Sequence, residues 1–478
     1  MRIPKLLQNS VAYSVVTVLQ KGVSFLLLPV YTLYMMPADY GILGVSTSVA
    51  SFLSIFMTLS LGAAAGRFYY KRQNDEKYIK RLYGTLVTIV LLNSFLMGGA
   101  FIALHKWVID PFLGKIDFIP YVLLSLLTAM VSPLYLYFQE YLQTIQDGVY
   151  YSVNSMCSFV IQVGLSVVFL AIFKMGVLGV LTANLITAVI FFIYALIVFS
   201  KRFKWGIDKD IAKDSFKYAL PLVPHQLAAW SNGTVDKLIV NGLKTETDAG
   251  LYNLGQQYSS VMGIVTNSIN RAYVPWFFDK VSYGEDGRKI IKKVAELLIC
   301  IITFVAIAMS LFGKELLDLM ISNPEYDGVW MMIPFLVTGY LFQGLYFFFV
   351  NILYLSHPKN VFIITLTTMA INIGLNFLLI PKWGCMGSAI VFTITFLIQS
   401  IITLLISMKK EKEVRYNWIS MYLICFLGVI LSMPVFFLGS MSLLGAIGIK
   451  ISILIVYAAI IIFRYKDEFE LLKSLIHK

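Results

Sequence analysis

Long apolar runs recur along almost the whole chain and limit what it can fold into. Runs of about 18 or more residues are long enough for a helix to cross a bilayer. Only 13% of the 478 residues are charged, whereas soluble domains carry roughly a quarter. The short alternating segments of a membrane β-barrel are absent from the sequence. We therefore expect an all-α integral membrane protein.

The apolar runs divide into about fourteen predicted transmembrane helices. They cover residues 9–35, 38–66, 82–105, 118–144, 150–173, 177–199, 218–241, 249–277, 290–313, 329–355, 360–380, 386–407, 417–438 and 443–463. Most Lys and Arg residues fall in alternate connecting segments, which the positive-inside rule assigns to the cytoplasm. We therefore expect a multi-pass protein of the inner (cytoplasmic) membrane with both termini in the cytoplasm.

The two halves of the chain match each other in order. Residues 38–41 (Ala-Asp-Tyr-Gly) match 247–250 (Thr-Asp-Ala-Gly), and Gly176-x-x-Gly179 matches Gly384-x-x-Gly387. Because each half holds an even number of predicted spans, this is a parallel repeat. We predict a six-helix lobe at 1–210 and a second six-helix lobe at 211–412. Residues 413–478 then form two additional helices and a cytoplasmic tail, and the pseudo-symmetric lobes surround a central cavity.

One predicted helix, 249–277, has a polar face. Its members fall at helical spacing, and the predicted second helix carries a matching polar stripe. The residues of these faces that we expect to line a cavity are Asn253, Gln257, Ser260 and Asn267, together with Ser51 and Thr58. Faces this polar cannot be solvated by lipid. The sequence therefore predicts a polar, water-containing cavity enclosed by protein.

A bilayer penalises charge within predicted spans, and three of the basic residues found there are candidate contacts for substrate: Lys21, Lys237 and Arg271. They could contact an anionic group such as a phosphate, which arginine grips through two parallel hydrogen bonds. The alternatives are a structural ion pair for Lys21 and extension of the side chain to the membrane surface for Lys237 and Arg271.

Three further residues are candidates for coupling transport to an ion: Asp236, His225 and Glu140. An ion pair of Asp236 with Lys21 is the competing structural interpretation. The four cysteines are scattered without metal-ligand spacing, so we expect neither a metal site nor another cofactor. No phosphate-binding loop is present, and the connecting segments are short, so we expect a protein that is not an enzyme.

Several short motifs resemble one known family. They are Pro29 with Tyr40-Gly41, the 221–224 segment with its two prolines, the Asp236-Lys237 pair, and Asp248 followed by Gly250-Leu251-Tyr252. In these residues the chain resembles the Wzx-type polysaccharide-biosynthesis flippases. That family belongs to the multidrug/oligosaccharidyl-lipid/polysaccharide exporter (MOP) superfamily.

The resemblance implies translocation of oligosaccharide repeat units linked to a polyprenyl diphosphate. It implies alternating access driven by H⁺ or Na⁺, and a role in making O-antigen (lipopolysaccharide), capsule or exopolysaccharide. Implied partners are membrane lipids and a polymerase and chain-length protein, with no nucleic acid. The alternatives are a peptidoglycan-precursor lipid flippase, a drug/cation antiporter of the same superfamily and, less favoured, a membrane glycosyltransferase or polymerase.

Overall fold

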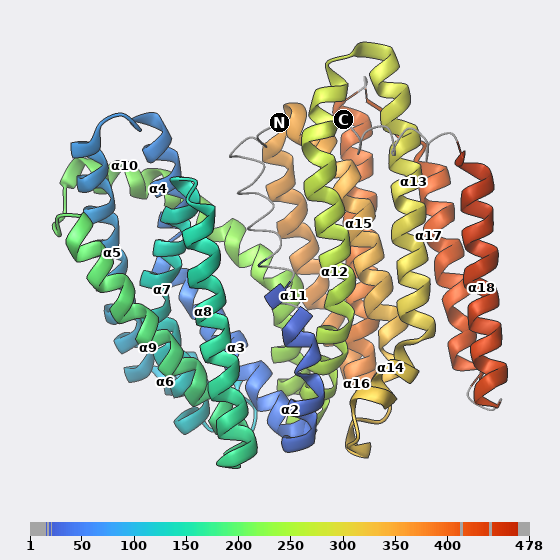
Figure 1. Ribbon diagram of the computed structural model, residues 1–478, viewed down its shortest axis with the longest axis horizontal. Coiled ribbons are helices and arrows are strands. Elements are labelled where there is room, and N and C mark those ends of the chain that lie inside the picture. The colour runs from blue at the N-terminus through green and yellow to red at the C-terminus, as the bar shows by residue number, and fades with distance from the viewer. Residues whose placement is uncertain (1–15, 17–18, 21, 412–413, 439–441, 467–478) are drawn as a thin grey trace. The chain divides into compact units, whose positions relative to one another are not determined.

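The computed structural model describes residues 16, 19–20, 22–411, 414–438 and 442–466. In these residues every regular element is helical and no strand occurs (Figure 1), which confirms the predicted fold class. The chain forms two compact units, one ending at Asn253 and the other beginning at Leu254. The predicted lobe boundaries at 210 and 412 stay predictions.

The first unit is built around α3 (Pro37–Thr58) and α7 (Leu123–Thr144). α7 packs against α9 and α5, and α3 packs against α7, α5 and α11. The other helices of this unit are α2 (Leu28–Tyr34), α4 (Leu61–Lys71), α5 (Glu76–Ala103), α6 (His105–Val108), α8 (Gly148–Val167), α9 (Gly176–Arg202), α10 (Lys209–Ala219) and α11 (Val223–Leu243). Short helical turns lie at Asp110–Phe112, Phe118–Val122, Val168–Ile172 and Leu220–Leu222.

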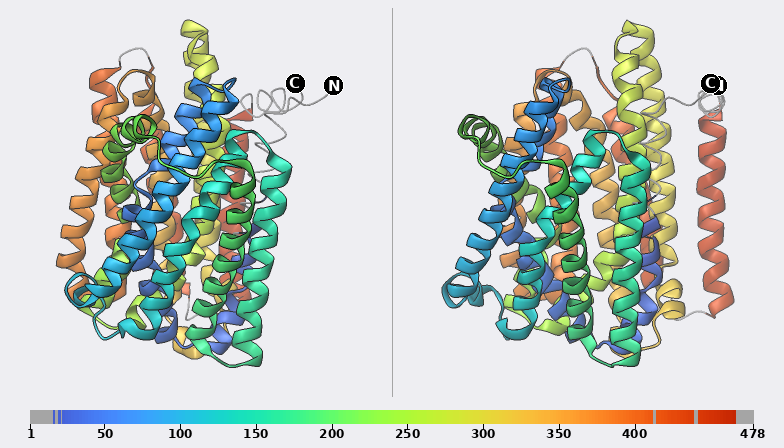
Figure 2. Two further views of the ribbon diagram at one scale, coloured as in Figure 1. Left: turned by 90° about the vertical axis from the view of Figure 1, so that its left-hand side faces the viewer. Right: turned by 60° about the vertical axis from the view of Figure 1, so that its left-hand side comes forward.

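The second unit contains most of the long helix α12 (Glu246–Val281), whose first turns belong to the first unit. It continues with α13 (Gly284–Leu311), α14 (Gly313–Met320), α15 (Ile333–Ser356), α16 (Pro358–Lys410), α17 (Trp418–Ser432) and α18 (Leu443–Arg464). Short helical turns lie at Pro324–Tyr326, Val329–Met331 and Met433–Phe436. α17 and α18 pack on α13, and α18 stands at the edge of this unit (Figures 1 and 2).

In the described part of the chain, ten helices are long and apolar enough to cross a membrane. They are α3, α5, α7, α8, α9, α13, α15, α16, α17 and α18, some extended by an adjoining helical turn. α11 and α12 fall outside this set, although both were predicted to span. The count of about fourteen spans stays a prediction.

Two helical hairpins, one in each unit, have turns of the same kind. Gly176 has a φ of 55°, and Gly384 inside α16 has a φ of 57°. Glycine adopts such angles without strain, unlike other residues. A Cβ added at Gly179 would lie 2.9 Å from a side chain of the preceding helical turn, and one at Gly387 would lie 2.6 Å from a carbonyl oxygen in the first half of α16. The two Gly-x-x-Gly matches in the sequence therefore mark two similar tight turns.

Amide side chains join the two arms of each hairpin. Gln162 of α8 donates to Asn184 of α9 at 2.8 Å, and Asn372 donates to Thr395 at 3.3 Å within α16. The second bond joins residues on either side of Gly384, so α16 is two helices that lie side by side. This agrees with the separate spans predicted at 360–380 and 386–407.

The single span predicted at 38–66 is interrupted. Leu59 and Ser60 have φ angles of 48° and 57°, and they separate α3 from α4. The last carbonyls of a helix lack partners within it. Here Asn93 of α5 donates to the carbonyls of Phe56 and Met57, at 2.8 and 2.7 Å. A side chain distant in the sequence therefore supplies partners for carbonyls at the interruption.

Helix α10 is held against α4 and α5 by charged and aromatic contacts. Asp208 caps the start of α10, and the Arg81 guanidinium donates to its carboxylate. That bond holds the pKa of the Asp208 carboxyl below its usual value. The Arg67 guanidinium lies 4.4 Å from the centre of the Tyr218 ring, within range for a cation–π contact.

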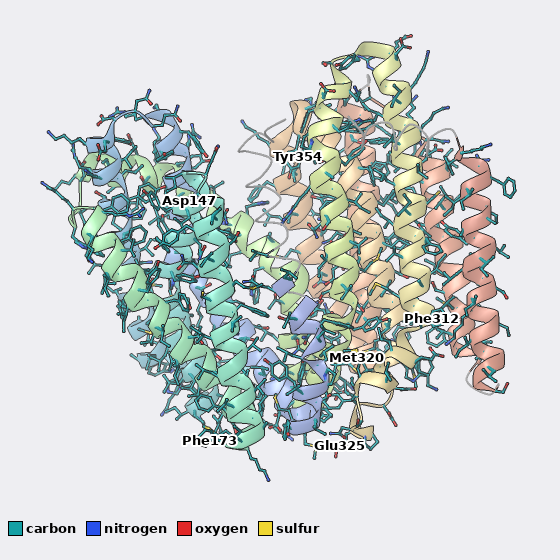
Figure 3. All side chains as sticks on the ribbon, in the orientation of Figure 1. Asp147, Phe173, Phe312, Met320, Glu325 and Tyr354 are labelled. Carbon is teal, nitrogen blue, oxygen red and sulfur yellow. The ribbon has the colours of Figure 1, made fainter. Side chains whose placement is uncertain are left out.

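Basic segments gather at one end of each unit. In the first unit, the α4–α5 turn and α10 lie at the end marked by Asp147, and Phe173 lies at the other end (Figure 3). In the second unit, the α12–α13 turn lies at the end marked by Tyr354, opposite Glu325. The positive-inside rule associates such ends with the cytoplasm. The orientation of the whole chain stays a prediction.

Candidate functional site

A buried carboxylate lies on α11. The Asp236 side chain has no exposed surface, and its Oδ2 accepts a hydrogen bond from the Tyr252 hydroxyl at 2.9 Å. A buried carboxylate needs such partners, because its transfer from water is costly. A carboxylate in a membrane helix is also a candidate for binding and releasing a proton or cation. Asp236 therefore remains a candidate for ion coupling. It lies on α11 and is hydrogen-bonded to the first turns of α12.

The other predicted charged residues occupy different positions. Lys237 follows Asp236 on α11 and is half-buried, whereas His225 is exposed near the start of α11. Glu140 lies on α7, where its carboxylate occupies the space over Gly62 of α4. Lys21 lies outside the described residues, so its predicted role is not examined by the structure.

The polar face predicted on α12 is partly accessible. Gln257 and Ser260 are half-buried, and Asn267 and Arg271 are exposed. The adjacent polar residues Gln256, Ser259 and Thr266 are buried. The polar face therefore adjoins the side of α12 that packs against other helices of the second unit.

That packing side of α12 contacts α13 and α15. The Tyr258 hydroxyl donates to the Met309 carbonyl of α13 at 3.0 Å, and Asn351 of α15 donates to Asn270 at 2.9 Å. Since α13 and α15 are both candidate membrane spans, α12 lies alongside membrane helices.

Asn253, whose place on a cavity wall stays a prediction, contributes to helix packing. Its Nδ2 donates to the Tyr40 carbonyl of α3 at 3.3 Å, and its carboxamide lies over Gly44. One turn away, Gly41 and Gly250 bring the two helices close together. A Cβ at Gly41 would lie 1.9 Å from the carbonyl oxygen of Glu246. The first turns of α12 are therefore packed tightly against α3.

A cavity of about 250 Å³ lies within the first unit, between α3, α7 and α9. These three helices are all candidate membrane spans. The hydroxyl groups on its wall belong to Thr47, Ser51, Ser54 and Thr58 of α3 and to Ser125, Thr128 and Ser132 of α7. Asn184 of α9 adds an amide, and the remaining lining residues, Ala50, Ala129, Pro133, Leu136 and Leu181, are apolar.

Two of the predicted cavity residues, Ser51 and Thr58, are thus brought together on one wall. An aromatic pair adjoins that wall. The Trp230 indole of α11 donates to the Ser51 hydroxyl at 2.9 Å, and its ring centre lies 4.9 Å from that of Phe52. The predicted polar stripe of α3 therefore borders a cavity, and all of the residues that line this cavity belong to the first unit.

Sequence reasoning missed the second hydroxyl-bearing wall. Ser125, Thr128 and Ser132 fall three and then four residues apart on α7, which places them on one side of a helix. The same spacing test that identified the stripe of α3 would have found them. Asn184 carried no comparable signal, because a lone amide in a span usually joins helices.

A family model and two curated relatives match this chain. The model described as "Polysaccharide biosynthesis protein" matches residues 6–281. "Lsg locus putative protein 1" of Haemophilus influenzae is 24% identical over 420 residues, covering 83% of this chain and 98% of that protein. An "Uncharacterized membrane protein" of the same organism is 23% identical over 362 residues, covering 74% and 85% respectively.

Solved structures share the fold. The lipid II flippase MurJ, in an inward closed conformation, has a TM-score of 0.75 at 13% identity, with 95% of this chain and 99% of that chain covered. An inward-facing multidrug resistance MATE family transporter of the MOP superfamily has a TM-score of 0.59 at 16% identity, covering 80% and 94%. This chain is a multi-pass membrane protein with that fold, and it belongs to the polysaccharide biosynthesis protein family.

Proposed function

We propose that this protein moves lipid-diphosphate-linked oligosaccharide repeat units across the cytoplasmic membrane by alternating access. The observation that carries the proposal is the polar face of α12. Gln257, Asn267 and Arg271 are accessible on a helix that packs alongside the membrane helices α13 and α15. Lipid cannot solvate these groups, so the face borders a water-containing path that a polar headgroup can use.

The exposed charge on this face suits a diphosphate. Arg271 presents a guanidinium that can donate two parallel hydrogen bonds to phosphate oxygens. Lys237 and Lys21 are the other candidates for contact with phosphate, as the family resemblance implies. Asp236, with His225 and Glu140 as further candidates, would couple transport to a gradient of H⁺ or Na⁺.

The family supports a role in polysaccharide synthesis, with O-antigen, capsule or exopolysaccharide units as cargo. We place the protein in the inner membrane with both termini in the cytoplasm. The gathering of basic segments at one end of each unit supports this orientation. A polymerase and a chain-length protein would be its partners in the pathway.

Two alternatives share the fold. The similarity to MurJ keeps a peptidoglycan-precursor flippase as an alternative, and the similarity to a MATE transporter keeps a drug/cation antiporter. The cavity of the first unit argues against cationic cargo at that site, because no carboxylate lines it. A glycosyltransferase would need catalytic acids, and the short connections between the described helices offer little room for them.

The proposal is tested with purified protein in liposomes. Transport of a fluorescent polyprenyl-diphosphate oligosaccharide should require the protein, and Arg271→Ala should slow it about tenfold or more, as expected for a lost charged hydrogen bond. Arg202→Ala, at the exposed end of α9, is the matched control and should transport normally. If the wild-type protein moves no lipid-diphosphate saccharide, the proposed function is wrong. If Arg271→Ala transports normally, Arg271 is not a phosphate contact.

A further inference from the structure

We infer that the cavity between α3, α7 and α9 is a binding site for a neutral saccharide. This inference deepens the proposed function and rests on it, because the saccharide is taken to be the sugar part of the lipid-linked cargo. The site lies within the first unit, so its walls come from helices that pack directly against one another.

The hydroxyl groups of the cavity are arranged as hydrogen-bond acceptors. Six of the seven donate their proton to a carbonyl of their own helix. On α3, for example, Ser54 donates to the Ser51 carbonyl at 2.7 Å, and on α7 Thr128 donates to the Leu124 carbonyl at 2.8 Å. A hydroxyl oxygen that has used its proton still has lone pairs. Most of the accessible wall is apolar and its hydroxyl oxygens act as acceptors, so the wall suits a ligand that combines apolar faces with O–H donors, as a sugar does.

The seventh hydroxyl group of the cavity wall, that of Ser125, has no hydrogen-bond partner among the described residues. Ser125 is 5% exposed and lines the cavity. A buried hydroxyl without a partner is unfavourable by about 1–3 kcal/mol. Rotation of this side chain toward the cavity would let a ligand hydroxyl pair with it and relieve that penalty.

Two further polar groups on the wall extend this pattern. Asn184 accepts from Gln162 through its carboxamide oxygen, which leaves its NH₂ group as a donor. The second group is the backbone carbonyl of Ala129. Pro133, one turn later in α7, has no N–H and so cannot donate the usual helical hydrogen bond to this carbonyl. Both Pro133 and Ala129 line the cavity. The wall therefore offers acceptors together with a donor.

Charge and size restrict the ligand class. No charged side chain lines the cavity, so an ionic group would enter without a counter-ion. The volume of about 250 Å³ has room for several water molecules, and so for one sugar ring. Leu136 and Leu181 supply apolar surface for the C–H faces of such a ring.

Protection of an introduced thiol tests the site directly. Ser54→Cys places a thiol on the cavity wall of the full-length protein, and Cys157, exposed on α8 away from the cavity, serves as an internal control. The probes are maltotriose, chitotriose and a trisaccharide of galacturonic acid, each at millimolar concentration. Maleimide labelling of both positions is read by peptide mass spectrometry.

We expect at least one of the two neutral sugars to slow labelling at position 54 severalfold and to leave Cys157 unchanged. The acidic trisaccharide should protect much less. If neither neutral sugar protects position 54, or if the acidic sugar protects equally well, the inference is overturned. This measurement uses free sugars, so its result does not depend on whether the protein transports lipid.

Transport variants provide the second test. Thr58→Val and Thr128→Val remove hydroxyls from the two walls with little change in shape. Each should slow transport of the oligosaccharide-bearing lipid about fivefold, the effect of one hydrogen bond. Neither should change transport of the same lipid diphosphate without sugar. Thr365→Val of α16 removes a similar self-bonded hydroxyl away from the cavity and is the control.

The two proposals can fail separately. In one outcome, Thr58→Val, Thr128→Val and wild type transport the oligosaccharide lipid at equal rates, and no neutral sugar protects the thiol. This result would retain the proposed function and refute the saccharide site. In the other outcome, neutral sugars protect the thiol but the protein transports neither lipid. This result would retain the saccharide site and refute the proposed function.

Discussion

At the scale of single residues, the most buried charge pair described lies in the second unit. Lys450 of α18 donates to Glu315 of α14, and their side chains are 3% and 25% exposed. The second carboxylate oxygen of Glu315 is buried and has no partner in the described part of the chain. Removing one member of a buried pair leaves the other charge uncompensated. The pair therefore links α18 to the rest of the unit, and a substitution of either residue alone should strongly lower the stability of the protein.

We predict that Lys450→Met will destabilise the protein by about 3–5 kcal/mol, because Glu315 is left partly buried and charged without its partner. The double variant Lys450→Met/Glu315→Gln should recover much of that loss. The measurement is the unfolding midpoint in detergent, followed for both variants and wild type. Equal midpoints for the single and double variants would show that the pair does not couple the two helices.

At the scale of elements, the contact between α3 and α12 has approximate two-fold symmetry. A Cβ added at Gly41 would lie 1.9 Å from the Glu246 carbonyl oxygen, and one at Gly250 would lie 1.8 Å from the Pro37 carbonyl oxygen. In the sequence repeat Gly41 matches Gly250, and Pro37 matches Glu246 at the same offset. Each helix therefore offers the same backbone surface to the other. This is the arrangement of an isologous contact, here between two halves of one chain.

Gly250→Ala should force these helices apart, since the new methyl group would overlap a backbone carbonyl that cannot rotate away. We expect a loss of about 1–3 kcal/mol of stability, the usual range for overpacking. Gly242→Ala on α11 is the matched control, because an added Cβ there meets nothing within 4 Å. Thermal unfolding in detergent measures both variants. A midpoint for Gly250→Ala equal to that of Gly242→Ala would contradict the tight contact.

The same elements show what could be predicted from sequence and what could not. The apolar runs, the Gly-x-x-Gly turns and the polar stripe of α3 are local patterns, and the structure places helices, turns and a cavity wall there. The carbonyls near the end of α3 at Thr58 accept hydrogen bonds from Asn93, which comes from another helix. Asn253 was assigned to a cavity on spacing alone, and its packing on α3 required knowledge of the neighbouring helix.

At the scale of the whole molecule, the ion coupling that we propose means that an ion gradient performs work on the cargo. A gradient of two pH units is worth about 2.7 kcal/mol per proton, or about 100-fold in accumulation at equilibrium. We propose Asp236 as the carboxylate that binds and releases that proton. It is fully buried in α11, bonded to Tyr252 of α12, and adjacent to Lys237. A change in the protonation of Asp236 would therefore alter the contact between α11 and α12.

Asp236→Asn keeps the size of the side chain and an oxygen that can accept from Tyr252, but it cannot carry a proton. We predict that this variant still exchanges lipid-linked saccharide between leaflets, and that an imposed pH gradient no longer drives accumulation in one leaflet. Asp248→Asn, which alters a carboxylate bonded to Thr245 in the first turn of α12, is the control and should keep the response. Fluorescent cargo measured with and without the gradient distinguishes the variants. Accumulation by Asp236→Asn equal to wild type would assign proton coupling to another group.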